Sequence, residues 1–349
     1  MLTIDGRMGE GGGQVLRTSL SLAALTGQPF RLTHVRANRA KPGLRPQHLT
    51  AVRAVARLCG AALTGDALDS RTLEFRPAMP PQPGEYHFDV TDAAQGGSAG
   101  AIMLIFQAVL WPLLFAGGAS RLVLRGGTHV PMSPPYHYVA HVARPAFGRM
   151  GATFDLALER WGWYPVGGGV VRANITPVAR LDAPLFEHVP AERIDGVAAV
   201  TNLPADIPQR MAGRATNLLT AAGRRSKIEP RRENGAGPGA GIFLWTPQGG
   251  FGSIGRPGLP SERVAEAAVA ETLAFLDNGA MVDRHLADQL LLPLALAHGR
   301  TQYTTDHLTL HTTTSADLLR LWLDTTIAID GELGGPAEID ITGVGFSHV

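Results

Sequence analysis

Hydrophobic residues along the chain recur with the two periods that helices and strands require. Over 14–25, 46–58 and 135–150, apolar residues lie three or four positions apart, which places them on one face of a helix. Gly27 and Gly60 follow the first two segments and are typical helix ends. Stretches of alternating, β-branched or aromatic residues predict strands at 2–6, 30–37, 72–77, 86–91 and 121–127. Strands and helices thus follow one another, which predicts an α/β (α+β) fold.

The segment 100–119 is almost wholly apolar and has nearly the length of a membrane span. Gln107 and Pro112 interrupt it, however. We therefore interpret this segment as a fully buried helix, and we expect no membrane partner.

The succession of strands and two helices recurs about every 70–90 residues, but it changes near residue 180. Residues 183–277 read as a separate small unit, in which the Arg-, Gly- and Pro-rich segment 223–240 predicts a mobile loop. A small unit inserted into a larger α/β domain is the simplest account. The other elements predicted after residue 180 are strands at 195–203, 241–247 and 307–313, and helices at 207–222, 261–277 (capped by Ser261), 288–297 and 315–324.

Composition narrows the class of protein. Hydrophobic residues make up 45% of the 349 residues, which is enough for a sizeable core. The formal net charge of +1 does not by itself indicate a nucleic-acid binder. Cys59 is the single cysteine, so an internal disulfide and a CxxC site are excluded. A reducing compartment fits this, and the first residues have no pattern of a secretory signal, so we expect a cytoplasmic protein.

A glycine-rich segment at 9–13 is the first candidate for chemistry. Glu10 lies within it, Gln14 follows it, and Arg17 lies one turn into the predicted helix. Adjacent glycines let backbone N–H groups approach an anion, and a helix N-terminus favours negative charge. The segment predicts either an anion site, with Glu10 on a metal ion and Arg17 on a phosphate, or a plain turn. It fits neither the Walker A nor the GxGxxG pattern.

A basic cluster follows, and it has two interpretations. It predicts a phosphate or nucleic-acid track, or else a solvated charged loop. The cluster consists of Arg36, Arg39, Lys41, Arg45 and His48.

The segment 306–315, DHLTLHTTTS, combines two histidines with hydroxyl residues. Alternation in it predicts a strand that carries His307 and His311 on one face. Thr314 resembles a helix start, so His311 is expected where the strand meets a helix N-terminus. A histidine there can attack a phosphoryl group, with hydroxyl and backbone N–H groups stabilising the charge. A hydrogen-bonded structural histidine is the alternative.

Two weaker candidates remain. Asp288 and Gln289 are polar residues on a predicted helix of Leu and Ala, where they either have structural partners or face a site. The segment WYPVGGG at 163–169 reads as a turn.

Together these segments resemble the RNA 3′-terminal phosphate cyclase family. Its landmarks occur in order over nearly the whole chain: GEGGGQVLRTSLSLAALTGQPF, VRANRAKPGLRPQHLTAVRA, YPVGGG, HLADQLLLPLALA and a late HTTT. The resemblance implies three repeats of a unit with a four-stranded sheet and two helices, plus an inserted small α/β domain. We expect residues 1–182 and 278–349 to form the repeats and 183–277 to form the insert.

The resemblance also implies a reaction in three steps. A histidine attacks the α-phosphate of ATP, which gives a covalent histidine–AMP and pyrophosphate. The AMP moves to the RNA 3′-phosphate, and the neighbouring 2′-hydroxyl then forms the 2′,3′-cyclic phosphate and releases AMP. The implied partners are ATP, a divalent metal (Mg or Mn) and an RNA with a 3′-terminal phosphate. A homodimer is a further arrangement that we consider.

Residue roles follow from the same resemblance. His311 is the nucleophile and Glu10 the metal ligand, while Arg17, Arg39 and His48 complete the catalytic group. The residues expected around the nucleotide are Gln14, Arg36, Gln107, Pro131 (on the adenine), His285, Asp288 and Gln289.

Five positions depart from the family pattern, which predicts a remodelled site and leaves the choice between ATP and GTP open. These are Ser315 for Asn, Pro46 for Arg, Ala101 for a hydroxyl residue, His285 for an aromatic residue and Trp161 for a basic residue.

Two other functions fit parts of the pattern. A non-catalytic cyclase-like factor in ribosome assembly would lack the nucleophilic histidine, so His311 argues against it. An enolpyruvyl-transferase-like enzyme on the related repeat fold would need neither a covalent nucleotide nor an inserted domain.

Overall fold

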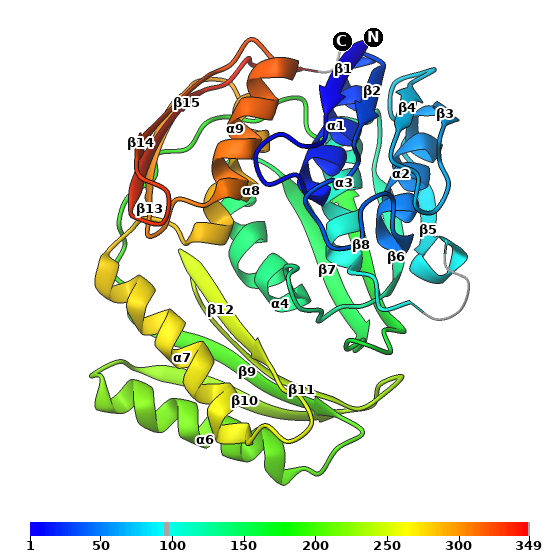
Figure 1. Cartoon of the computed structure of the whole chain (residues 1–349). Helices are drawn as coiled ribbons and strands as arrows, with labels where there is room; N and C mark the ends of the chain where they lie inside the picture. Colours follow the sequence, from blue (N-terminus) through cyan, green and yellow to red (C-terminus); the bar gives the residue numbers. More distant parts are fainter. Residues whose placement is uncertain (94–97, 348–349) are drawn as a thin grey trace.

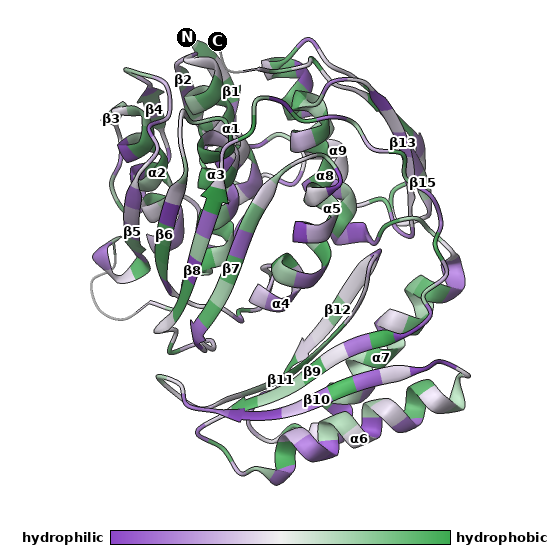
Figure 2. Cartoon of the chain, turned by 180° about the vertical axis from the view of Figure 1, so that it is seen from behind, coloured by the Kyte–Doolittle hydropathy of each residue, from purple (hydrophilic) through white to green (hydrophobic). Residues whose placement is uncertain are grey.

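The computed structural model of the chain describes residues 1–93 and 98–347. Strands in these residues form four sheets, and three of the sheets lie on the outside of a group of helices (Figures 1 and 2). The predicted mixed α/β fold is confirmed.

The first sheet has the strand order β1-β2-β4-β3, in which β1 and β2 are parallel and the other neighbours antiparallel. Gly27 and Gly60 end its two helices with φ of 69° and 60°, a conformation that glycine adopts without strain. The elements are β1 (Leu2–Asp5), α1 (Gly13–Thr26), β2 (Phe30–Thr33), α2 (Pro46–Cys59), β3 (Ala62–Thr64) and β4 (Leu73–Arg76).

The second sheet has the order β5-β6-β8-β7, with the same parallel and antiparallel neighbours at corresponding positions. The single helix predicted over 135–150 is divided here by a π-helical turn. The elements are β5 (Glu85–Asp89), η1 (Val90–Ala93), α3 (Ile102–Leu114), β6 (Ser120–Gly126), α4 (Tyr136–Tyr138), η2 (Val139–Ala143), α5 (Arg144–Gly148), β7 (Thr153–Arg160) and β8 (Gly169–Thr176).

The third sheet lies near the C-terminal end of the chain and has the order β13-β15-β14, all antiparallel. Val282 adds a single parallel bridge to Thr305 of β13. The elements are α8 (Arg284–Leu296), β13 (Arg300–Thr305), α9 (Leu310–Trp322), β14 (Thr326–Gly331) and β15 (Ala337–Thr342).

A fourth sheet and two helices form a layer of their own, drawn at the bottom of Figure 1, which we call the small unit (residues 194–278). One face of its sheet packs under α6 and α7, and the other face meets Trp161 and Trp163. The strand order of this sheet is β10-β9-β11-β12. The elements, in chain order, are β9 (Ile194–Thr201), α6 (Asp206–Ala221), β10 (Ser226–Glu233), β11 (Gly239–Thr246), β12 (Gly249–Ile254) and α7 (Ser261–Asn278).

Two predictions within the small unit are wrong. Residues 223–240 are not a mobile loop, because they contain β10, which pairs with β9 over its full length. Pro230 is tolerated there because β10 is an edge strand. Ser261 is the first residue of α7 and makes no side-chain cap; Pro260 precedes it.

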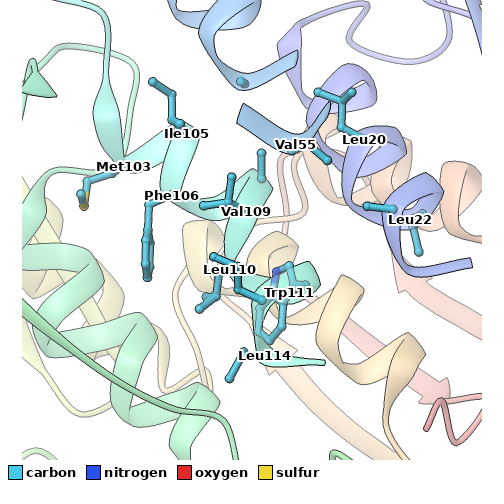
Figure 3. Close-up of a cluster of buried hydrophobic side chains, with 14 of the residues drawn as sticks. Leu20, Leu22, Val55, Met103, Ile105, Phe106, Val109, Leu110, Trp111 and Leu114 are labelled. Atoms are coloured by element: carbon cyan, nitrogen blue, oxygen red, sulfur yellow. The ribbon is translucent and has the colours of Figure 1, made fainter. Parts of the chain in front are cut away.

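The apolar segment that imitates a membrane span is the central helix, α3. All its residues except Gln107 are buried, and its side chains lie against α1 and α2, as Figure 3 shows for Leu22, Val55 and Val109. Burial of a helix that is apolar on all sides is a main source of stability in such a fold. No helix in the described residues is long and apolar enough to cross a membrane.

Candidate active site

His311 lies in the first turn of α9, at the centre of a group of polar residues. The strand predicted over 307–313 and the helix start predicted at Thr314 are both wrong. Thr309 is the helix cap, and its Oγ1 accepts a hydrogen bond of 3.2 Å from the Thr312 N–H. A hydroxyl cap at this place lets the threonine-rich segment enter a helix despite its strand-like alternation.

The imidazole of His311 lies between two carboxylates. Its Nε2 is 2.6 Å from Glu10 Oε2, and its Nδ1 is 3.3 Å from Asp288 Oδ2. The Glu10 oxygen accepts no hydrogen bond from the described residues, so this short contact lacks the alignment of a hydrogen bond. The side chains of Glu10 and Asp288 are 17% and 16% exposed, whereas that of His311 is 39% exposed. The site is therefore open on the imidazole side.

The glycine-rich loop is attached directly to α9. The Glu10 N–H donates to Thr314 Oγ1 at 3.0 Å. Gly9 has a φ of 51°, and a Cβ atom added to it would lie 1.9 Å from the same Thr314 oxygen. Only glycine permits this close approach, which brings Glu10 to His311.

Gln14 connects three helices around the histidine. Its Nε2 donates to the Ser315 hydroxyl and to the His311 carbonyl oxygen (3.3 Å), and it lies 3.5 Å from Asp288 Oδ2. Its Oε1 is buried without a hydrogen-bond partner in the described part of the chain, so it is a free acceptor inside the site.

Arginines lie beside the glycine-rich loop. Arg39 forms an ion pair with Glu10. Burial lowers the pKa of Arg17 to about 10, with Arg36 contributing and the Asp288 charge opposing the change. Arg36 donates to two carbonyl oxygens, of Lys41 (2.7 Å) and Gly43 (2.9 Å). Arg17 is thus still cationic at neutral pH.

His48 lies behind this loop and is neutral. It is buried, and burial together with Arg36, Arg17, Arg45 and Arg39 lowers its pKa well below the usual value. A Cβ atom added to Gly13 would lie 2.6 Å from His48 Nε2. His48 can therefore offer a hydrogen bond at the start of α1, but it does not carry a charge.

A second chain of polar contacts extends from α3 to α8. Gln107 Nε2 donates to Gln289 Oε1, and Gln289 Nε2 donates to the His285 carbonyl oxygen, both at 2.8 Å. The His285 side chain is exposed, and its ring is nearly perpendicular to that of Tyr138, with ring centroids 6.1 Å apart. Pro131 is exposed in the turn between β6 and α4, and its contact with adenine stays a prediction.

The chain matches the family described as "RNA 3'-terminal phosphate cyclase" over residues 8–329. It belongs to this family. A relative of that name from Trichormus variabilis is 52% identical over 91% of this chain and 93% of its own length. Others, from Methylococcus capsulatus (50%; 90% of this chain, 89% of its own) and Archaeoglobus fulgidus (37%; 95% and 98%), carry the same name. A crystal structure of the enolpyruvyl transferase NikO from Streptomyces tendae aligns at 16% identity and a TM-score of 0.40, with 99% of this chain and 49% of that one covered, which is too weak to bear on function.

The departures from the cyclase pattern have different surroundings. Ser315 is in the site, where its hydroxyl accepts from Gln14. Pro46 begins α2, and Arg45 before it pairs with Asp69. Trp161 is buried against the small unit, stacked on His129 with ring centroids 4.4 Å apart. Ser315 is linked to the histidine through Gln14, which also donates to the His311 carbonyl oxygen.

Sequence reasoning missed two residues that shape this cyclase site. Thr314 anchors Glu10, and Gln47 Oε1 accepts from the N–H of Ala101, another departure, at 2.9 Å, which joins α2 to the start of α3. The signal for Thr314 was present in its spacing from His311, since residues three apart in a helix share a face. It was hidden because the segment was interpreted as a strand.

Proposed function

We propose that the protein converts the 3′-terminal phosphate of an RNA to a 2′,3′-cyclic phosphate in an ATP-dependent reaction through a covalent His311–AMP. Membership of the cyclase family supports the overall reaction. The observation that carries the mechanism is the position of His311, an accessible imidazole between two carboxylates.

In this mechanism Asp288 prepares the nucleophile. A carboxylate at Nδ1 favours the tautomer with hydrogen on Nδ1, which leaves a lone pair on Nε2. It also stabilises the positive charge that the ring acquires as Nε2 forms a bond to phosphorus. Glu10 covers Nε2 in this structure, so its carboxylate has to turn away before ATP is attacked.

The triphosphate is placed by the start of α1. The N-terminus of α1 follows the glycine-rich loop and favours negative charge, and Arg17, Arg36 and Arg39 supply positive charge. Gln107, Asp288 and Gln289 line the nucleotide site from α3 and α8, with Pro131 on the adenine. His48 donates or accepts a hydrogen bond without adding charge.

A divalent metal fits at Glu10. In the described residues, no three His, Cys, Asp or Glu side chains are grouped as metal ligands. Mg²⁺ commonly takes one or two carboxylates and completes its shell with water and substrate phosphates, and Glu10 Oε2 would serve as such a ligand once it has turned away from His311. Bound Mg²⁺ or Mn²⁺ would neutralise charge on the triphosphate.

The remaining steps use the bound adenylate. An oxygen of the RNA 3′-phosphate attacks phosphorus, the bond to His311 breaks, and an RNA–phosphate–AMP anhydride results. The neighbouring 2′-hydroxyl then attacks the RNA phosphorus, AMP leaves, and the ring closes. Activation is needed because a phosphate oxygen is a poor leaving group, whereas AMP is a good one.

We also propose that residues 1–182 and 278–349 are three copies of one unit and that 183–277 is an inserted domain. The first two sheets have the same strand order and directions. The third lacks a full first strand, where Val282 makes only a bridge.

The proposal is tested with an RNA that ends in a 3′-phosphate. Incubation with ATP and Mg²⁺ is expected to make the end resistant to phosphatase and to release one AMP per end. An RNA with a 3′-hydroxyl serves as the control and should release none. A phosphate end that stays phosphatase-sensitive with every nucleotide and metal would exclude the function.

A further inference from the structure

A buried carboxylate outside the active-site group, Asp283, joins the small unit to α8. It is fully buried and directly precedes α8. Its Oδ1 accepts from the N–H groups of His285 (2.7 Å) and Leu286 (2.8 Å), and its Oδ2 accepts from the Gly250 N–H of β12 (2.8 Å). The Tyr138 hydroxyl of α4 lies 2.9 and 3.0 Å from the two oxygens. One side chain therefore connects three separate parts of the molecule, and we call these contacts of Asp283 the junction.

A helix cap alone does not account for these contacts. Capping uses only Oδ1, whereas Oδ2 bonds to a backbone N–H of the small unit. The Asp283 N–H also donates to the Gln248 carbonyl oxygen at 3.1 Å. Between these two bonds, a Cβ atom on Gly249 would lie 2.9 Å from Asp283 Cβ and Oδ2. The turn from β11 to β12 thus approaches Asp283 as closely as a backbone without side chains allows.

The next residue extends the junction towards α9. Arg284 pairs with Asp306 at 2.6 Å, and the Asp306 side chain is only 5% exposed. The Arg284 guanidinium also lies 5.8 Å from the centre of the Phe251 ring in β12. Asp306 is in the segment that leads into α9, so Arg284 of α8 links Phe251 of the small unit to the chain just before α9.

The distance from this junction to the reacting group is short along the chain. Asp288 is five residues after Asp283 on the same helix, and its Oδ2 lies 3.3 Å from His311 Nδ1. Packed helices move as rigid bodies, so a shift of the α8 N-terminus displaces Asp288 as well. A displacement of about 1 Å at a catalytic group is enough to slow a reaction.

We propose that Asp283 is a positioning residue through which the small unit sets the geometry of Asp288 and His311. The small unit then contributes to nucleotidyl transfer without touching the reacting atoms. This inference rests on the proposed function, since it assumes that His311 is the nucleophile.

Two variants test it from opposite sides of the junction. Asp283→Asn keeps the volume and the cap acceptor but places an amide where Gly250 needs an acceptor. Gly249→Ala changes only the small unit, where the added Cβ would press on Asp283 and equally on Phe275 of α7. Each is expected to lower the maximal rate of His311 labelling by α-labelled ATP about tenfold or more, with the half-saturating ATP concentration little changed. Because both substitutions break the same contact, the double variant should lose much less rate than the product of the two single losses.

Val269→Ala is the matched control, because Val269 is buried in the core of the small unit and is not among the contacts of Asp283. It should lower the unfolding temperature and leave the labelling rate of the folded protein unchanged. The inference is overturned if both junction variants label like Val269→Ala.

A second readout does not depend on labelling. Absence of label in the unsubstituted protein would refute the proposed function rather than this inference. The ¹⁵N signals of the His311 ring would then decide it, because moving Asp288 away from Nδ1 should shift them in both junction variants. Unchanged signals would overturn the inference.

Discussion

At the scale of single residues, the imidazole of His311 has a carboxylate at each ring nitrogen. The two carboxylates differ in their other partners, which separates their roles. Glu10 also pairs with Arg39 beside the glycine-rich loop, where phosphates are expected. Asp288 Oδ2 accepts a long hydrogen bond (3.5 Å) from Gln14 Nε2, and it lies on the other side of the ring. In the proposed mechanism Glu10 therefore holds the metal ion beside the incoming phosphate, and Asp288 holds the histidine.

Asp288→Asn tests this division. Asparagine keeps the shape and can still accept a hydrogen bond from Nδ1, but it cannot stabilise the charged ring. We expect the single-turnover rate of labelling by α-labelled ATP to fall at least about tenfold, which corresponds to about 1.4 kcal/mol of activation free energy.

Asp317→Asn is the control for this substitution. Asp317 is on the exposed face of α9, where Arg320 is its one ion-pair partner among the residues that the structure describes. Such surface pairs contribute little to stability, so the control should label normally. Equal rates for both variants would contradict the role of Asp288.

At the scale of elements, the site depends on contact between the glycine-rich loop and α9. Gly9→Ala should break this contact, because its added Cβ would clash with the buried Thr314 in addition to straining a positive φ. We expect at least about a tenfold loss of labelling and a loss of about 1 kcal/mol or more in the free energy of unfolding. Time courses of labelling measure the first effect, and denaturant titration measures the free energy of unfolding.

Gly27→Ala separates strain from function. Gly27 has a similar positive φ of 69°, but in the described part of the chain nothing beyond its own sequence neighbours lies within 4 Å of an added Cβ. This control should lose about 1 kcal/mol of stability and keep its labelling rate. If Gly9→Ala labels as fast as Gly27→Ala, the contact is not needed.

The elements also show what sequence alone could predict. The ends of α1 and α2 followed from Gly27 and Gly60, because left-handed helix ends favour glycine strongly. The helix at His311 did not follow, since β-branched threonines in alternation favour a strand locally. The cap at Thr309 and the contacts with Glu10 and Gln14 outweigh that preference, and the last two involve residues about 300 positions away.

At the scale of the whole molecule, the small unit meets the rest of the chain through aromatic rings and histidines. His129 Nε2 lies 2.9 Å from His137 Nδ1, and both side chains are buried. Trp161 stacks on His129. Burial, followed by His141 and Arg231, lowers the pKa of His137 to about 3, and burial also lowers that of His129. The interface therefore contains uncharged histidines at neutral pH.

This arrangement predicts how stability depends on pH. Because the folded-state pKa of His137 is depressed, the unfolded chain takes up a proton below about pH 6.5 that the folded chain does not. The contribution of the neutral, buried His137 to the free energy of unfolding is fully present above that pH and is lost as the pH falls towards 3. His137→Gln should therefore flatten the pH dependence by roughly 1.4 kcal/mol per pH unit between pH 6 and 4. Denaturant titrations at several pH values measure the free energy of unfolding of both proteins. The prediction is contradicted if that free energy changes with pH equally steeply in His137→Gln and in the unsubstituted protein.

The most direct test of the account is covalent labelling with α-labelled ATP and Mg²⁺, followed by denaturing electrophoresis. We predict an acid-labile, alkali-stable label that a 3′-phosphorylated RNA removes. His307→Ala, which changes a histidine four positions before His311, should label normally, whereas His311→Ala should not label at all. Equal labelling of the two variants would contradict the central claim that His311 carries the adenylate.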